Sequence, residues 1–134
     1  VVLQPRAARL VARVHVGKLG LSGTSLIPLT DKALSERRVL ADGGLVMLTV
    51  VLDKKARLVS APQVQLMGVP SGELEPETLV TDLVSTVEEI MAELSSRVLQ
   101  SDDALRESLQ REFGAMMRQW LGLKPKQMVN IVRI

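Results

Sequence analysis

Apolar positions repeat with a helical period along two long segments in the second half of the chain. In the first, they recur every three or four residues over positions 79–98, which predicts an amphipathic helix of about six turns over residues 76–99. In the second, the apolar stripe covers positions 105–120 and stops at Gly122. Only two or three residues separate these segments, so we expect two long antiparallel helices.

Three other segments have the pattern of β-strands. Residues 45–52 are continuously apolar and rich in β-branched side chains, which predicts a central strand buried on both faces. Residues 57–60 follow a turn and are expected to pair back on this strand as a hairpin, and residues 128–133 form a last strand. Residues 63–66 alternate polar and apolar, as a half-exposed edge segment does.

The first part of the chain predicts shorter elements. Strands are expected over residues 9–14, 19–21 and 26–29, which together are too small to enclose a core. A short helix follows, with Thr30 or Asp31 as its N-cap and Gly43 as its left-handed C-terminal residue.

These elements predict an α+β fold of two layers. A small mixed sheet of about three strands (45–52, 57–60 and 128–133) is covered on one face by the antiparallel pair of long helices. We expect residues 1–28 to be a β-rich lead-in and residues 29–134 to form the domain proper. The chain does not begin with Met, so we expect it to be part of a longer protein.

Composition narrows the class of protein without identifying its function. With 134 residues, 46% hydrophobic and 24% charged, the chain has the make-up of an ordinary folded domain. No apolar run reaches the 18 or so residues of a membrane-spanning helix, so no membrane association is expected. The absence of cysteine excludes disulfides, cysteine nucleophiles and thiolate metal sites.

The net charge of +2 conceals an uneven distribution. Residues 1–60 carry ten Lys and Arg against four Asp and Glu, whereas residues 61–103 carry one against nine. The basic residues are spread out, and one Phe with one Trp offers no platform for stacking bases. Four positions remain as candidate RNA contacts: Arg37, Arg38, Lys54 and Lys55.

Candidate catalytic residues are few, and each has a structural explanation. His15 is the only histidine and lies between two valines, as a partly buried structural residue would. Glu88, Glu89 and Glu93 could act as acid and base or bind magnesium, but they fall on the polar side of the first long helix. Met116, Met117 and Trp120 have the spacing of core residues. We therefore predict no catalytic, cofactor-binding or metal-binding residues in this chain.

An apolar interface is an open alternative to simple core packing at three positions. Val80 flanks the main stripe of the first long helix, and Val129 and Ile131 belong to the last strand. Uncovered apolar area and open sheet edges are sites for a partner, so these three side chains are candidate interface residues.

The order of motifs resembles the C-terminal domain of ribonuclease J, within the metallo-β-lactamase/β-CASP nuclease family. The motifs span most of the chain, from about residue 14 to the end. They are Val16-Gly17-Lys18-Leu19, the run from Leu34 through Glu36-Arg37-Arg38 to Gly43-Gly44, the apolar strand 45–52, Ala61-Pro62-Gln63-Val64, Met67-Gly68, the two long helices and Lys124-Pro125-Lys126-Gln127-Met128-Val129. The chain departs from the family at Val69–Gly72, where an aromatic segment is common, and at Gln127.

This resemblance implies an accessory role in RNA degradation and processing. In the family, histidines and aspartates of the β-lactamase domain hold two zinc ions, and none of those residues is present here, so zinc is implied only for the catalytic domain of the parent protein. The C-terminal domain is implicated in oligomerisation, here as a dimer, and in full nuclease activity. The implied partners are a second copy and the preceding nuclease domains, with RNA bound only through the parent enzyme in the cytoplasm.

Two other functions stay open from the residues alone. A nucleic-acid-binding module would use the basic N-terminal residues together with Arg37 and Arg38, and its affinity for RNA would fall steeply with salt. A free-standing enzyme is the least favoured of the three functions, since the sequence offers no nucleophile, no general base and no metal ligands in a catalytic pattern.

Overall fold

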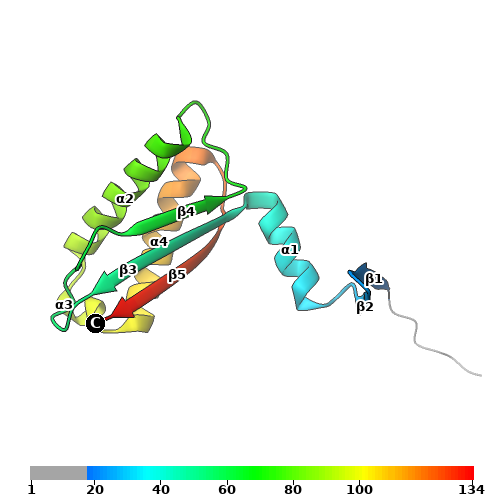
Figure 1. Ribbon diagram of the computed structural model, residues 1–134, viewed down its shortest axis with the longest axis horizontal. Coiled ribbons are helices and arrows are strands. Elements are labelled where there is room, and N and C mark those ends of the chain that lie inside the picture. The colour runs from blue at the N-terminus through cyan, green and yellow to red at the C-terminus, as the bar shows by residue number, and fades with distance from the viewer. Residues whose placement is uncertain (1–17) are drawn as a thin grey trace, which may run out of the picture. The chain divides into compact units, whose positions relative to one another are not determined.

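The computed structural model describes residues 18–134 (Figure 1). The chain divides into two compact units, with the boundary between Ser35 and Glu36, and each is described by itself. The strand predicted over residues 9–14 and the interpretation of His15 as a structural residue lie outside the described residues.

The first unit contains a β-hairpin. Strand β1 (Leu19–Ser22) pairs antiparallel with β2 (Ser25–Pro28), and Leu21 lies opposite Leu26. The two strands confirm those predicted over residues 19–21 and 26–29, to within one or two residues. The turn between them contains Gly23 in the left-handed conformation, with φ of 60°.

Helix α1 (Lys32–Gly43) follows the hairpin. The backbone N–H of Ala33 donates to Oδ1 of Asp31 at 2.8 Å, which confirms Asp31 as the capping residue. The prediction for the end of this helix was wrong by one residue. Gly43 is still helical, and Gly44 has the left-handed φ of 78° while its N–H donates to the carbonyl of Leu40 at 2.8 Å.

The second unit contains a three-stranded mixed sheet in the order β4-β3-β5. The central strand β3 (Leu45–Leu52) pairs antiparallel with β4 (Gln63–Met67) and parallel with β5 (Lys126–Arg133). The mixed sheet of three strands is confirmed, but one of its members was wrongly predicted. Residues 63–67 take the place that was expected for residues 57–60.

Residues 57–60 turn back on the end of β3 but do not extend into a strand. The carboxylate of Asp53 accepts the backbone N–H groups of Lys55 and Arg57 at 2.8 and 2.9 Å, and Ala56 is left-handed with φ of 58°. The N–H of Asp53 donates to the carbonyl of Arg57 and the N–H of Val59 donates to that of Val51, both at 2.9 Å, and a bridge joins Leu52 to Leu58, so the expected pairing with β3 is present but short. Pro62 then lacks the N–H that would continue a ladder, so pairing starts again at residue 63.

Three helices follow β4: α2 (Pro76–Glu93), α3 (Ser96–Leu99) and α4 (Asp102–Leu121). The first long helix was predicted to reach Leu99 but ends at Glu93, because the chain is extended at Leu94 and restarts with Ser95 as a new N-cap. The second begins as predicted after Ser101, whose Oγ accepts the N–H of Ala104 at 3.3 Å, and ends at left-handed Gly122.

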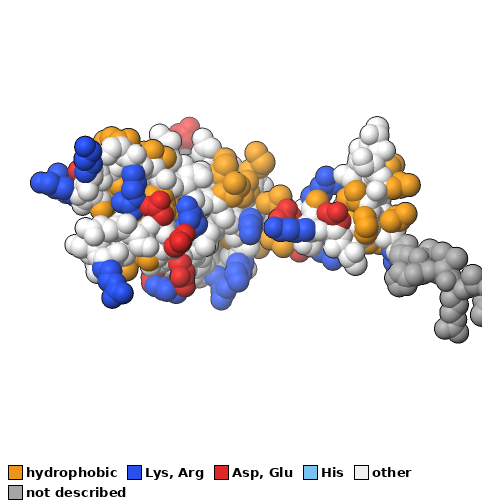
Figure 2. Space-filling model, turned by 90° about the horizontal axis from the view of Figure 1, so that it is seen from below, with side chains coloured by type: hydrophobic (Ala, Val, Ile, Leu, Met, Phe, Trp, Pro, Cys, Tyr) orange, Lys and Arg blue, Asp and Glu red, His pale blue; other side chains and the backbone are white. Residues whose placement is uncertain are grey.

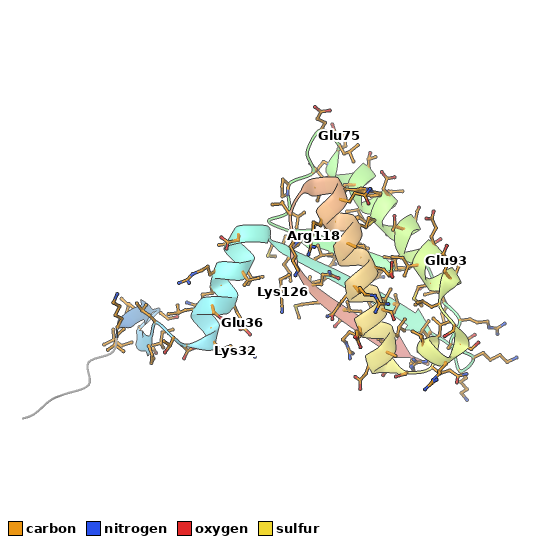
Figure 3. The ribbon with its side chains drawn as sticks, turned by 180° about the vertical axis from the view of Figure 1, so that it is seen from behind. Lys32, Glu36, Glu75, Glu93, Arg118 and Lys126 are labelled. Atoms are coloured by element: carbon orange, nitrogen blue, oxygen red, sulfur yellow. The ribbon has the colours of Figure 1, made fainter. Side chains whose placement is uncertain are left out.

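Helices α2 and α4 lie over the same face of the sheet, behind it in Figure 1 and in front of it in Figure 3, with α3 between them along the chain. Every second residue of β3 is buried beneath them, and Phe113 of α4 is fully buried. The core contains residues from both layers: Val46, Leu48, Val50, Leu52, Val64, Leu79, Leu83, Val87, Met91, Leu105, Leu109, Phe113, Met117 and Val129. The predicted two-layer α+β architecture is therefore observed.

Candidate interaction surface

The second face of the sheet has no helix over it. The alternate residues of β3 (Leu45, Met47, Thr49 and Val51) are only half-buried, although a strand this apolar is typical of burial on both sides. The described residues therefore cover one face of β3 and leave the other to solvent. We call this surface the open face: Leu45, Met47, Thr49, Val51, Gln63, Gln65, Met67, Lys126, Met128, Asn130 and Val132.

Apolar side chains occupy both ends of the open face. At one end, Leu45 is paired with Met67 and Met47 with Met128. Met67 is 68% exposed and Met128 is 49% exposed. At the other end, Val51 is paired with Val132, which is 42% exposed.

A polar row crosses the middle of the open face, between the two apolar ends. It consists of Gln63, Thr49 and Asn130, in register across the three strands. Asn130 Nδ2 donates to Thr49 Oγ1 at 3.5 Å, which ties β5 to β3 on this side. The face contains no acidic residue, and its one cation is Lys126 at the start of β5.

The outer edge of β5 is partly blocked by helix α4. Arg106 Nε donates to the carbonyl oxygen of Val129 at 3.3 Å, and Gln127 Nε2 donates to the carbonyl of Gln110 at 3.0 Å. At the end of the strand, Arg133 donates to the carbonyl of Leu99 and to Oδ1 of Asp102, both at 2.6 Å. A strand added at this edge would have to displace Arg106 from the Val129 carbonyl.

The three apolar residues predicted as an interface lie on the helix side of the sheet. Val129 is 6% exposed and belongs to the core, and Val80 and Ile131 are partly buried against it. The reason is the two-residue period of a strand, which turns odd positions of β5 toward the helices and even positions outward. Met128 and Val132 are therefore the exposed apolar residues of β5, and sequence reasoning missed them because it could not tell which alternate set faced the core.

The four residues predicted to contact RNA are exposed but fall in two separate places. Arg37 and Arg38 lie on α1, which leads into the start of β3, whereas Lys54 and Lys55 lie in the turn after its end. The eight residues of β3, a strand roughly 25 Å long, lie between the two pairs along the chain. Figure 2 shows basic side chains spread over one face of the molecule, with acidic side chains among them.

The other residues considered for chemistry do not gather into a site. Glu88, Glu89 and Glu93 are exposed on α2, and Figure 3 shows Glu93 on the outer side of that helix. Within residues 18–134, no three His, Asp or Glu residues lie close enough together to hold a metal ion. Met117 is buried in the core, and Trp120 is 48% exposed.

A shallow open groove lies between the turn after β3 and helix α2. It encloses about 320 Å³ and is lined by Ala56, Arg57, Leu58, Glu88, Met91, Ala92, Leu94 and Leu99. The pKa of the nearby Asp53 carboxyl is held below its usual value, chiefly by the backbone N–H of Arg57, with help from the N–H of Lys55 and the Arg57 charge. The groove is apolar with one charge of each sign, and its turn is rigidly hydrogen-bonded.

The hairpin of the first unit has an apolar side of its own. Leu19, Leu21 and Leu26 are 59%, 71% and 68% exposed, and the register places Leu21 beside Leu26 and Leu19 beside Pro28. A two-stranded hairpin with one exposed apolar side is marginal by itself in water.

Comparison with known proteins identifies the family. Residues 32–134 match the ribonuclease J C-terminal domain. The chain belongs to this family. The match starts at α1 and includes the whole sheet and all the helices that cover it.

Two curated relatives extend the comparison. The chain is 28% identical over 137 aligned positions to a ribonuclease J of Sinorhizobium meliloti, an alignment that covers 98% of this chain and 23% of the relative. It is 29% identical over 106 positions to a ribonuclease J of Corynebacterium glutamicum, with 78% of this chain and 15% of the relative covered. The chain thus spans less than a quarter of the length of either relative. In addition, no helix among the described residues is both long and apolar enough to span a bilayer.

Proposed function

We propose that this chain is a non-catalytic accessory domain that supports RNA degradation by the nuclease domains of a ribonuclease J polypeptide. The observation that carries the proposal is the family match over residues 32–134, in a chain that corresponds to only 15–23% of its relatives' length. The partners are the preceding nuclease domains and a second copy of the chain, and the site of action is the cytoplasm. Residues 1–28 serve as the lead-in from the nuclease domains.

The structure supports an accessory role by the kind of surface it offers. The described residues present an apolar sheet face and an apolar hairpin rather than a concave site with converging ionisable groups. Such surfaces are suited to contact with other protein. The domain would act by holding the catalytic parts in an active assembly.

The test compares a ribonuclease J polypeptide that ends in this chain with a version that lacks residues 29–134. We expect the truncated enzyme to degrade a single-stranded RNA several-fold more slowly, and its mass in solution to be that of a smaller assembly. The control is a full-length variant with Gln119→Ala at an exposed position of α4. Equal rates and equal assembly size in all three proteins would overturn the proposal.

Direct RNA binding is not favoured by the arrangement of the basic residues. The pairs Arg37–Arg38 and Lys54–Lys55 lie at opposite ends of β3, and a few separated cations give weak, strongly salt-dependent binding. Retention of RNA by the isolated chain near physiological salt, lost in an Arg37→Ala/Arg38→Ala variant, would favour the nucleic-acid-binding alternative instead.

A further inference from the structure

We propose that the groove between helix α2 and the turn after β3 binds an extended segment of another protein, in which a lysine or arginine stands beside an apolar residue. This goes beyond the accessory role proposed above, since it gives the chain a recognition site for a separate partner. Four features of the groove point to this class of partner: its shape, a free backbone edge, its charge and its apolar lining.

The shape of the groove suits an extended chain. A second hollow of about 350 Å³ adjoins the first, since Leu58 and Glu88 line both, and it continues along Val59, Ser60 and Ala61. In Figure 1, the loop between β3 and β4 runs past the end of α2 before it enters the sheet. An open channel between a helix and a chain segment fits a peptide better than a small molecule, because small-molecule sites enclose most of the ligand surface.

One wall of the groove offers unpaired backbone groups. The carbonyl of Arg57 and the N–H of Val59 are bonded to the end of β3, each at 2.9 Å. Since residues along such a pairing alternate between bonded and unbonded, the N–H and the carbonyl of Leu58, which lies between these two, point away from β3. Within the described part of the chain, no hydrogen bond uses either group. An extended peptide can pair with them, as in the addition of a strand to a sheet edge.

The charge of the groove favours a cation. Glu88 lines both hollows, and its carboxylate forms no ion pair with another residue of the described range. Ala92 lies one turn further along α2, which ends there without a basic residue in its last turn. The last carbonyls of a helix form the negative end of its dipole. Arg57 is the one cation among the lining residues, and it is already paired with Asp53 at 3.2 Å.

The same charge disfavours RNA as the occupant. Proteins bind phosphates through lysine and arginine, whereas the unpaired charge in this groove is a carboxylate. A lysine or arginine of a partner protein would instead meet both Glu88 and the end of α2. We therefore assign the groove to a basic peptide segment.

Apolar side chains supply the contact for the neighbouring residue of the partner. Val59 is 51% exposed, and Leu94 and Leu99 are only partly buried against the core. Met91 also lines the groove but is 5% exposed, so it belongs to the floor. Removal of such side chains from water favours binding. An apolar residue of the partner would lie on this surface while its basic neighbour lies at Glu88.

The test starts from a random peptide library displayed on phage and selected on the 134-residue chain. We expect the enriched sequences to place Lys or Arg beside an apolar residue. The most enriched peptide is then synthesised with a fluorescein label and titrated by fluorescence anisotropy. Enrichment of acidic sequences, or of none above background, would overturn the proposal.

Matched variants then separate the groove from its surroundings. Glu88→Lys should weaken peptide binding about tenfold or more, whereas Glu89→Lys, the next residue of α2 and outside the lining, should leave it within about twofold. Val59→Asp should weaken binding by a similar factor, and Val39→Asp, at a position of α1 that is 46% exposed, is its control. Circular dichroism verifies that each variant is folded. Equal effects within either pair would overturn the proposal.

Amide NMR of the chain distinguishes the other occupants. The peptide should shift the signals of Leu58 and Ala92 and slow the exchange of the Leu58 amide proton, whereas a single-stranded RNA oligonucleotide at the same concentration should leave them unchanged. The same shifts produced by RNA, or by a higher concentration of the chain alone, would assign the groove to RNA or to a second copy and overturn the proposal. Because binding is measured on the chain alone, the outcome is independent of whether residues 29–134 stimulate the nuclease.

Discussion

At the junction between α1 and β3, two successive glycines lie against the backbone of other segments. A Cβ added at Gly43 would lie 2.8 Å from the carbonyl oxygen of Lys124, and one at Gly44 would lie 2.5 Å from that of Gly68. Backbone atoms cannot move aside as a flexible side chain can, so these positions fix how closely α1, β4 and β5 approach each other. The pair Gly43-Gly44 is therefore required by packing as well as by the turn.

Gly44→Ala tests this constraint. We expect it to lower the free energy of unfolding by more than about 2 kcal/mol, because a left-handed φ and a backbone clash act together. Gly122→Ala is the matched control, since Gly122 has φ of 65° but open space around its Cβ and should lose only about 1 kcal/mol. Urea unfolding measures both, and equal losses would show that the contact with Gly68 does not matter.

Asp53 makes the stability of the folded chain depend on pH. Its pKa is lowered in the folded chain, chiefly by the N–H of Arg57. A carboxyl whose pKa is lower in the folded chain than in the unfolded chain stabilises the fold. This stabilisation is fully present above the pKa of the unfolded chain, near 3.9, and is lost as the pH falls through the lower pKa of the folded chain. NMR titration should therefore show the Asp53 carboxylate protonating below pH 3.8. In Asp53→Asn, the acid-side loss of stability should be smaller, and an unshifted titration would contradict this account.

At the scale of elements, one side chain joins the far end of β5 to the helices. Arg133 binds both the last carbonyl of α3 and the first turn of α4, through Leu99 and Asp102. The strand and the corner between the helices are joined by these bonds, although they are 31 and 34 residues apart along the chain. Hydrogen bonds to charged groups are stronger than neutral ones, and their loss leaves a carbonyl without a partner.

Arg133→Ala should lower the free energy of unfolding by about 1–3 kcal/mol. A double-mutant cycle with Asp102→Asn separates the ion pair from the bond to the Leu99 carbonyl. We expect a coupling of about 1 kcal/mol or less between the two side chains, since both are partly exposed. If the coupling with Asp102 accounted for the whole loss of stability in Arg133→Ala, the hydrogen bond to the Leu99 carbonyl would contribute nothing to stability.

At the scale of the whole molecule, the buried core of the described residues 18–134 lies within the second unit. All of its buried members lie between Val46 and Val129, and none comes from the hairpin. The second unit therefore has the composition of an independent folding unit, whereas the hairpin has an exposed apolar side and little to hold it.

Removal of residues 1–28 tests this division. We expect residues 29–134 to unfold cooperatively, with a free energy within about 1 kcal/mol of the full chain, because every buried core residue among the described positions lies at Val46 or beyond. Urea denaturation monitored by the fluorescence of Trp120, the single tryptophan, measures this. A large loss of stability or of cooperativity would show that the hairpin belongs to the same folding unit.

The sequence by itself determined the local features of this protein. Helix α4 lies where its apolar stripe and caps placed it, because Ser101 and Gly122 act through bonds within a few residues. The same holds for Asp31 and for the turns of the hairpin. The order of motifs also pointed to the family, since short motifs in a fixed order survive changes in the rest of the sequence.

Only the tertiary structure decided which segment pairs with β3 and which side of each strand is buried. The stretches 57–60 and 63–67 both carry apolar side chains suited to a sheet, but only 63–67 forms a continuous ladder with β3, and its Val64 is buried in the core under the helices. For β5, a shift of one residue would exchange Val129 for Met128 in the core. Such decisions depend on contacts between residues far apart in sequence, which a local pattern does not contain.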